Sequence, residues 1–124
     1  MEQPVAVPLL SGPHSLSAKI IERTITRKSP GVYLLSALED GVASARRVGR
    51  SKDDVGAHLK ECIGLYSQFA FAYASSPENA YEIECEIYHS MAPPENTKHP
   101  AKPADAVWVC PVCGPVIKRV VGGH

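Results

Sequence analysis

The sequence predicts a mixed α/β domain of the α+β type, in which a small sheet is flanked by helices. Three observations lead to this prediction: an apolar run followed by a tight reversal, a short segment in which large and small residues alternate, and several segments with helical spacing. With 124 residues, of which 44% are hydrophobic, the chain has the size of one domain with a real core.

Residues 1–28 are predicted to be an N-terminal extension that contains a helix from Ser15 to about Lys28. Apolar residues recur there at helical spacing, and Ser15 or Ser17 can cap the start. These apolar residues are Leu16, Ile20, Ile21 and Ile25. Ser29-Pro30-Gly31 then ends the helix.

A β-hairpin is expected next. Val32-Tyr33-Leu34-Leu35 is typical of a buried strand, and Asp40-Gly41 supplies a tight reversal into a second strand that runs to about Val48. Ser51, followed three residues later by Asp54, resembles a capping box and predicts a helix that runs to about Ile63.

A strand and a second helix follow. Phe69, Phe71 and Tyr73 alternate with alanines, which predicts a strand with one bulky face. Ser76 is then expected to be the N-cap of a helix that has Pro77 in its first turn and ends at about Met91. The predicted order is therefore helix, strand, strand, helix, strand, helix.

The formal net charge is zero, so the chain lacks the overall basic charge of many nucleic-acid-binding proteins. Charge is nevertheless segregated locally. A basic cluster consists of Arg46, Arg47, Arg50 and Lys52, and an acidic group consists of Glu78, Glu82, Glu84, Glu86 and Glu95. A basic rim beside an acidic pocket suits metal-assisted chemistry on phosphodiesters, although solvated helix faces and a charged turn would give the same pattern.

Four patterns in a fixed order are similar to those of the GIY-YIG nuclease superfamily, over residues 29–97. They are Gly31-Val32-Tyr33, Val48-Gly49-Arg50-Ser51, the pair Ala80 and Glu84, and Asn96. The resemblance implies a small three-stranded antiparallel sheet flanked by helices. It also implies that Tyr33 helps to activate the attacking water, that Glu84 holds a divalent cation, Mg²⁺ or Mn²⁺, against the scissile phosphate, and that Asn96 belongs to the site.

Two positions depart from the pattern of the family. Arg47 stands where the second motif would supply a tyrosine, and His58 stands where the following helix would supply an arginine. Arg47 can still offer a bidentate contact to phosphate, and His58 can serve as a cationic donor or general acid. Histidine is only partly charged at neutral pH, so neither replacement is equivalent. Arg46, Arg47 and Arg50 are the predicted contacts to DNA phosphates.

A second group of residues predicts a structural zinc site. Cys110-Pro111-Val112-Cys113 is a C-x2-C knuckle, and Cys85 and His89 are spaced to share one face of the preceding helix. Together they make a Cys3His set, with His99 as an alternative ligand or a neighbour of Asn96. A redox pair and simple buried thiols are the other interpretations, and Cys62 is expected to be a core residue.

Residues 98–124 form the C-terminal segment that zinc would hold in place. Six of the eleven prolines of the chain lie in residues 93–115, which argues against regular helix or central strand there. A metal cross-link would supply folding energy to such a segment. Some GIY-YIG-like proteins resemble this chain in a Cys-x-x-Tyr-His helix and a tail like Trp108 to Cys113.

Glu2 and three prolines interrupt the apolar residues of the first 13 positions, so no signal peptide is expected there. We therefore expect a cytoplasmic protein without a membrane contact. The leading functional hypothesis is a metal-dependent endonuclease that cleaves DNA. The alternatives are a nucleic-acid-binding or protein-interaction module that has lost catalysis, and a purely structural zinc-binding subunit. A protein partner or a homo-oligomer stays open.

Overall fold

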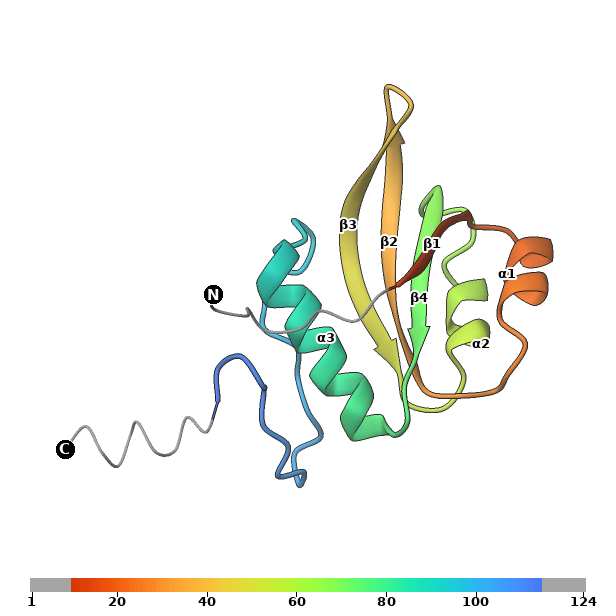
Figure 1. Ribbon diagram of the computed structural model, residues 1–124. Coiled ribbons are helices and arrows are strands. Elements are labelled where there is room, and N and C mark those ends of the chain that lie inside the picture. The colour runs from red at the N-terminus through yellow and green to blue at the C-terminus, as the bar shows by residue number, and fades with distance from the viewer. Residues whose placement is uncertain (1–9, 115–124) are drawn as a thin grey trace, which may run out of the picture.

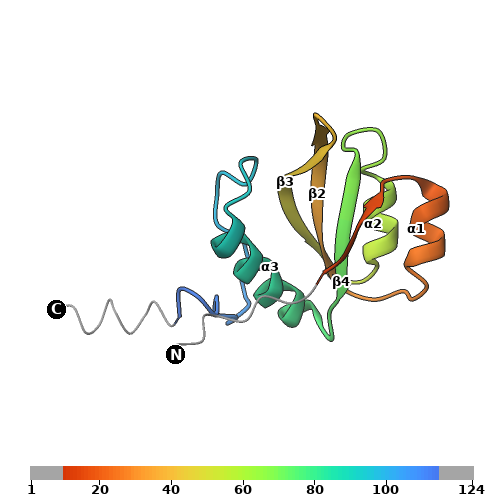
Figure 2. The ribbon, with the colours of Figure 1, turned by 45° about the horizontal axis from the view of Figure 1, so that its top comes forward.

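A computed structural model describes residues 10–114 of the chain; residues 1–9 and 115–124, the outer ends of the two predicted terminal segments, lie outside it. The elements are β1 (Ser11–Ser15), α1 (Ala18–Thr24), β2 (Gly31–Glu39), β3 (Val42–Ser51), α2 (Val55–Lys60), β4 (Gln68–Tyr73) and α3 (Pro77–Met91). The strands form one antiparallel sheet in the order β1-β4-β2-β3. Helices α1 and α2 cover one face, and α3 covers the other (Figures 1 and 2).

The sheet has four strands, and the prediction of three was wrong because it omitted β1. This strand pairs with β4 along one edge of the sheet, and most of its residues are exposed. Its sequence, Ser-Gly-Pro-His-Ser, has no alternation of apolar and polar residues that would predict a strand. Proline lacks the N–H that pairs with a neighbouring strand, so it is tolerated at the edge of a sheet. Because β1 takes up Ser15, helix α1 begins later than predicted, with Ser17 as its N-cap.

The sheet separates two apolar cores. On the face of α1 and α2, large side chains of β2 and β4 pack with the helices; this core includes Ile21, Tyr33, Leu35, Leu59, Phe69 and Phe71. On the other face, the small side chains of β4 let α3 approach closely; this core includes Val32, Leu34, Val48, Ala70, Ala80, Ile83 and Ile87. The bulky side of β4 and its alanine side are therefore both buried.

The two later helices begin at different kinds of cap. Ser76 caps α3 through the backbone N–H of Asn79, and Pro77 occupies the first turn, so the predicted start and end of α3 are confirmed. Helix α2 is shorter than predicted. The Ser51 hydroxyl accepts from the N–H of Asp54, but Ser51 still belongs to β3, and Asp54 is the N-cap.

The chain beyond α3 crosses to the free edge of β3 and then runs back beside α3 (Figure 1). Ala92 ends the helix in the left-handed conformation. Residues 92–114 contain neither helix nor strand, as the prolines predict. This segment brings Cys113 close to His89 of α3 and the carbonyl oxygen of Ala101 close to Arg50 of β3.

Candidate active site and metal centre

A cleft of about 430 Å³ lies at the edge of β3 and gathers residues from six parts of the chain. Its lining comes from β2, β3, the turn between β3 and α2, α2, α3 and the loop that follows α3. The residues are Tyr33, Arg47, Val48, Gly49, Arg50, Lys52, His58, Glu84 and Asn96. All four residues predicted to be catalytic, and two of the three arginines predicted to contact DNA, therefore share one cavity.

Tyr33 enters the cleft from the buried middle of the sheet. Only 7% of its surface is exposed, and its ring centroid lies 5.7 Å from that of His58 on α2. Burial is the main cause that raises the pKa of Tyr33 to about 12; the neighbouring Cys62 adds to the rise, and the charge of Arg47 opposes it. The hydroxyl therefore keeps its proton at neutral pH and can donate a hydrogen bond, but it is a poor general base.

Glu84 faces the cleft from α3, where it is also 7% exposed. Its Oε1 accepts a hydrogen bond of 2.5 Å from Nη1 of Arg50, which lies on β3. Burial raises the pKa of Glu84, and the hydrogen bond and charge of Arg50 counteract that rise. A guanidinium thus occupies the position next to the carboxylate where a divalent cation was expected.

The guanidinium of Arg50 has two further contacts. Its Nη2 donates to the carbonyl oxygen of Ala101 at 2.5 Å, and its Cζ lies 5.2 Å from the centre of the Tyr81 ring. Arg50 consequently joins three parts of the molecule: β3, helix α3 and the C-terminal segment.

Asn96 holds the loop after α3 against the free edge of β3. Its Oδ1 accepts from the N–H of Val48 at 2.8 Å, and its Nδ2 donates to the carbonyl oxygen of Val48 at 3.0 Å. One residue earlier, the N–H of Glu95 donates to the carbonyl oxygen of Arg46. Both polar ends of the Asn96 amide are thus engaged with backbone, which is the geometry of a residue that positions β3.

The basic cluster is divided by an irregularity in the hairpin. Leu35 pairs with Arg47, but the next residue of β2, Ser36, pairs with Ala45, so Arg46 is the extra residue of a bulge. The Arg46 side chain forms an ion pair with Glu39. It does not line the cleft, whereas Arg47, Arg50 and Lys52 do.

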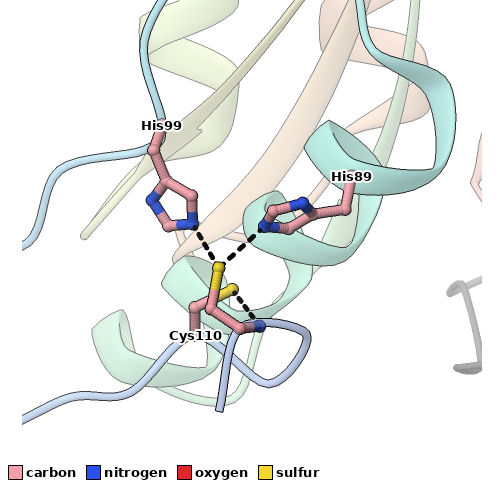
Figure 3. A group of neighbouring side chains, drawn as sticks. His89, His99 and Cys110 are labelled. Atoms are coloured by element: carbon pink, nitrogen blue, oxygen red, sulfur yellow. Dashed lines mark hydrogen bonds between the residues drawn. The ribbon is translucent and has the colours of Figure 1, made fainter. Parts of the chain in front are cut away.

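A separate group of His and Cys side chains lies beside α3. It consists of His89, His99, Cys110 and Cys113, whose ligand atoms all lie within 4.8 Å of one another. The Cys113 Sγ is 3.4 Å from Nε2 of His89 and 3.6 Å from Nε2 of His99. In Figure 3 the two imidazole rings, one from α3 and one from the following loop, converge above Cys110.

These distances fit a tetrahedral zinc ion. With zinc–sulfur bonds of about 2.3 Å and zinc–nitrogen bonds of about 2.0–2.1 Å, a tetrahedral centre separates its sulfur and nitrogen ligands by about 3.5 Å. Burial would raise the pKa of Cys110, but hydrogen bonds from the backbone N–H of Cys113, from His99 and from the backbone of Val112 outweigh it and lower the pKa to about 6. The thiolate, which is the form that binds metal, is thereby favoured.

Cys85, a predicted zinc ligand, lies next to this His2Cys2 group but is not part of it. The alternative ligand His99 completes the set instead. Cys85 is fully buried against Tyr81 and Cys110, one helical turn before His89. Burial is the main cause that raises the pKa of its thiol to about 12, so the thiol stays protonated.

No role was predicted for Tyr81, and Trp108 was named only as part of the tail that resembles other proteins, although both residues shape this region. Their ring centroids are 5.7 Å apart, and both line an apolar cavity of about 580 Å³ beside the metal centre. The position of Tyr81, one turn before Cys85, could have indicated its contact with the Cys-rich segment. The hydrogen bond from Arg50 to the carbonyl oxygen of Ala101 could not have been predicted from any pattern in the sequence.

No protein-family model matches this chain, and no curated protein or solved structure matches it significantly. Among residues 10–114, no helix is both long enough and apolar enough to cross a bilayer. The residues of the cleft and of the His2Cys2 group are therefore the features from which a function can be inferred.

Proposed function

We propose that the cleft is the active site of a GIY-YIG-like endonuclease that uses a divalent cation to hydrolyse DNA phosphodiester bonds. One observation supports this above all others. Tyr33, Arg47, His58 and Glu84 lie on four different elements, β2, β3, α2 and α3, yet they line a single cavity. Packing of the core alone does not require one acidic side chain, two basic side chains and a tyrosine hydroxyl to meet at one edge of a sheet.

The roles follow from the contacts of each side chain. Arg47 and Lys52 supply positive charge for a phosphate group at the rim. Glu84 supplies the carboxylate that a hard cation prefers, and Mg²⁺ or Mn²⁺ would there polarise the phosphate and offset its developing charge. Arg50 must first leave Glu84, and a DNA phosphate is the natural competitor for its guanidinium. Tyr33 positions the attacking water through its hydroxyl, while His58 beside it donates a proton.

The test is nicking of supercoiled plasmid and cleavage of branched DNA in the presence of Mg²⁺ or Mn²⁺. Glu84→Gln should lower the rate at least about 100-fold, because it removes a charge that acts on the transition state. Glu82→Gln is the matched control, since it makes the same change on the same helix outside the cleft. Cleavage by the Glu84→Gln variant at the parent rate would contradict the proposal.

Tyr33 allows a second, independent comparison in the same assay. Tyr33→Phe deletes only the hydroxyl and should reduce the rate while the ring keeps β2 packed. Tyr73→Phe deletes a hydroxyl on β4 that accepts from the N–H of Thr26 and does not line the cleft. Equal loss in both variants would indicate a general effect on the fold.

A second candidate function is a nucleic-acid-binding or protein-interaction module that does not cut. The ion pair between Arg50 and Glu84 favours it, because the carboxylate already has a cationic partner. This candidate predicts DNA binding without cleavage. Arg47→Glu should then weaken binding and flatten its salt dependence more than Arg46→Glu, since of these two arginines only Arg47 lines the cleft. Unchanged affinity in both variants would favour a protein partner.

The His2Cys2 group has a role of its own in this proposal. Residues 92–114 lack secondary structure, and a zinc ion held by four ligands would tie them to α3. Elemental analysis of protein purified without added metal should give about one zinc per chain. A metal-free chain of equal stability would contradict a structural zinc site.

A further inference from the structure

The metal centre and the cleft share two segments of the chain. Helix α3 carries Glu84 in the cleft and His89 in the His2Cys2 group. The loop after α3 carries His99 in that group and, two residues later, Ala101, whose carbonyl oxygen accepts from Arg50. The two sites are therefore connected by continuous short pieces of structure.

The link between His99 and Ala101 is stiff. The residue between them is Pro100, which is buried and has a fixed φ, and whose carbonyl oxygen lies 2.9 Å from Nδ1 of His99. A ligand bond at Nε2 of His99 would consequently restrict where Ala101, two residues further along the chain, can lie. The Ala101 carbonyl sets the position of Nη2 of Arg50 at 2.5 Å.

A second connection between the metal centre and Arg50 runs through Tyr81. The Tyr81 ring, 5.2 Å from the guanidinium, packs with Cys85 and with the metal-centre residue Cys110. The ring of Trp108, two residues before Cys110, also packs against Tyr81, with 5.7 Å between the ring centroids. Residues 92–114, which the metal would hold, thus supply one direct contact of Arg50, the Ala101 carbonyl oxygen, and part of the packing around Tyr81.

We propose that metal binding at His89, His99, Cys110 and Cys113 is thermodynamically coupled to the Arg50–Glu84 ion pair. With the metal bound, the Ala101 carbonyl and the Tyr81 ring hold Arg50 on Glu84. Without it, residues 92–114 loosen, Arg50 loses its hydrogen bond to Ala101, and the Tyr81 ring loses its packing against Cys110 and Trp108. The coupling rests on the proposed metal centre and does not require that the cleft cut DNA.

Coupling between two sites is reciprocal, so a change at Arg50 must alter the affinity for zinc. Arg50→Met keeps the aliphatic stem and removes the bonds to Glu84 and Ala101. Competition with a chromophoric chelator should show zinc bound about 10-fold more weakly by this variant, within the usual range for coupled sites. Arg50→Lys should also lower the affinity for zinc, because one ammonium group cannot donate to Glu84 and Ala101 in the way that the two guanidinium nitrogens do.

Arg46→Met is the matched control. Arg46 lies on the same strand and forms its own ion pair with a glutamate, Glu39, away from Ala101. Its replacement should leave the affinity for zinc unchanged. Equal zinc affinity in the parent, Arg50→Met and Arg50→Lys would overturn the coupling, and so would equal weakening by Arg46→Met.

A measurement on the unmodified chain keeps the proposal testable if the variants fold poorly. In ¹⁵N NMR spectra of the zinc-bound chain, the guanidinium N–H protons of Arg50 should exchange slowly with water. Removal of the zinc by a chelator should make that exchange faster. Identical Arg50 signals in both states would overturn the coupling. A chain that binds no zinc would overturn the coupling together with the metal centre, whereas zinc binding that is indifferent to Arg50 overturns the coupling alone.

Discussion

The ring of Tyr33 lies over Gly49, its direct partner on the neighbouring strand β3. The phenol oxygen is 2.5 Å, and Cζ 2.6 Å, from the position that a Cβ at residue 49 would occupy. Any side chain there would collide with the ring. Glycine at position 49 is therefore what allows a buried tyrosine of β2 to reach the cleft across the edge strand.

Gly49→Ala should destabilise the fold because Tyr33 must move and the core of α1 and α2 has little space for it. We expect a loss of about 1–3 kcal/mol in the free energy of unfolding, measured with denaturant. The cost should largely disappear in a Tyr33→Ala background, where the ring is absent. Strictly additive costs of the two substitutions would show that the close approach does not matter.

The titration of Tyr33 gives a second prediction. Its pKa of about 12 exceeds the ordinary 10.0, so between these values the folded chain keeps a proton that the unfolded chain loses. Stability should therefore fall as pH rises from 10 towards 12, by up to about 2–3 kcal/mol, and Tyr33→Phe should remove that dependence. The ultraviolet absorbance of tyrosinate, compared between the parent and Tyr33→Phe, should place the missing transition near pH 12.

Tyr73→Phe is the control for this titration. Burial would raise the pKa of Tyr73, but hydrogen bonds from Thr26 and Arg27 outweigh it and lower the pKa below 10.0. The tyrosinate transition that Tyr73→Phe removes should therefore lie below pH 10. A Tyr33 transition at or below pH 10 would contradict the burial of its hydroxyl.

Much of the fold was predictable from local signals. Ser76 and Pro77 fixed the start of α3, and the alternation at Phe69 and Phe71 identified β4, because caps and period-two patterns depend on near neighbours. Strand β1 was not predictable, since its polar residues are ordered by β4, far along the chain. Tertiary pairing, which leaves no local pattern, decided that element.

The candidate site divides in the same way. The order of motifs selected Tyr33, His58, Glu84 and Asn96, and these residues line one cleft. Spacing alone could not choose between Cys85 and His99, because the choice depends on how a loop with several prolines returns to α3. The ion pair of Arg50 with Glu84 was also not predictable, since it depends on the separation of β3 from α3.

The choice between Cys85 and His99 gives a third prediction. Cys85→Ser should retain about one zinc per chain, because the four ligand atoms of the His2Cys2 group remain. His99→Ala should lose zinc or bind it far more weakly, since three ligands leave a structural site incomplete. Elemental analysis after dialysis against a mild chelator distinguishes the two. Retention by His99→Ala with loss by Cys85→Ser would restore the Cys3His set.

The last prediction concerns the two residues that depart from the GIY-YIG pattern. His58 lies beside Tyr33, with 5.7 Å between their ring centroids, and Arg47 lines the same cleft. An arginine at position 58 would place a permanently charged guanidinium where the chain has an imidazole, and it would stabilise developing charge on a phosphate more strongly. A tyrosine at position 47 would add a second hydroxyl near the attacking water.

The double variant Arg47→Tyr with His58→Arg should therefore cut plasmid faster than the parent, by about 10-fold or more if one charged contact is gained. Arg46→Tyr with His58→Arg is a control, because Arg46 lies outside the cleft. If the parent cuts and the double variant is slower, Arg47 and His58 are functional substitutes with roles of their own. If only the double variant cuts, the natural chain uses the cleft for binding, and the ion pair of Arg50 with Glu84 is its resting state.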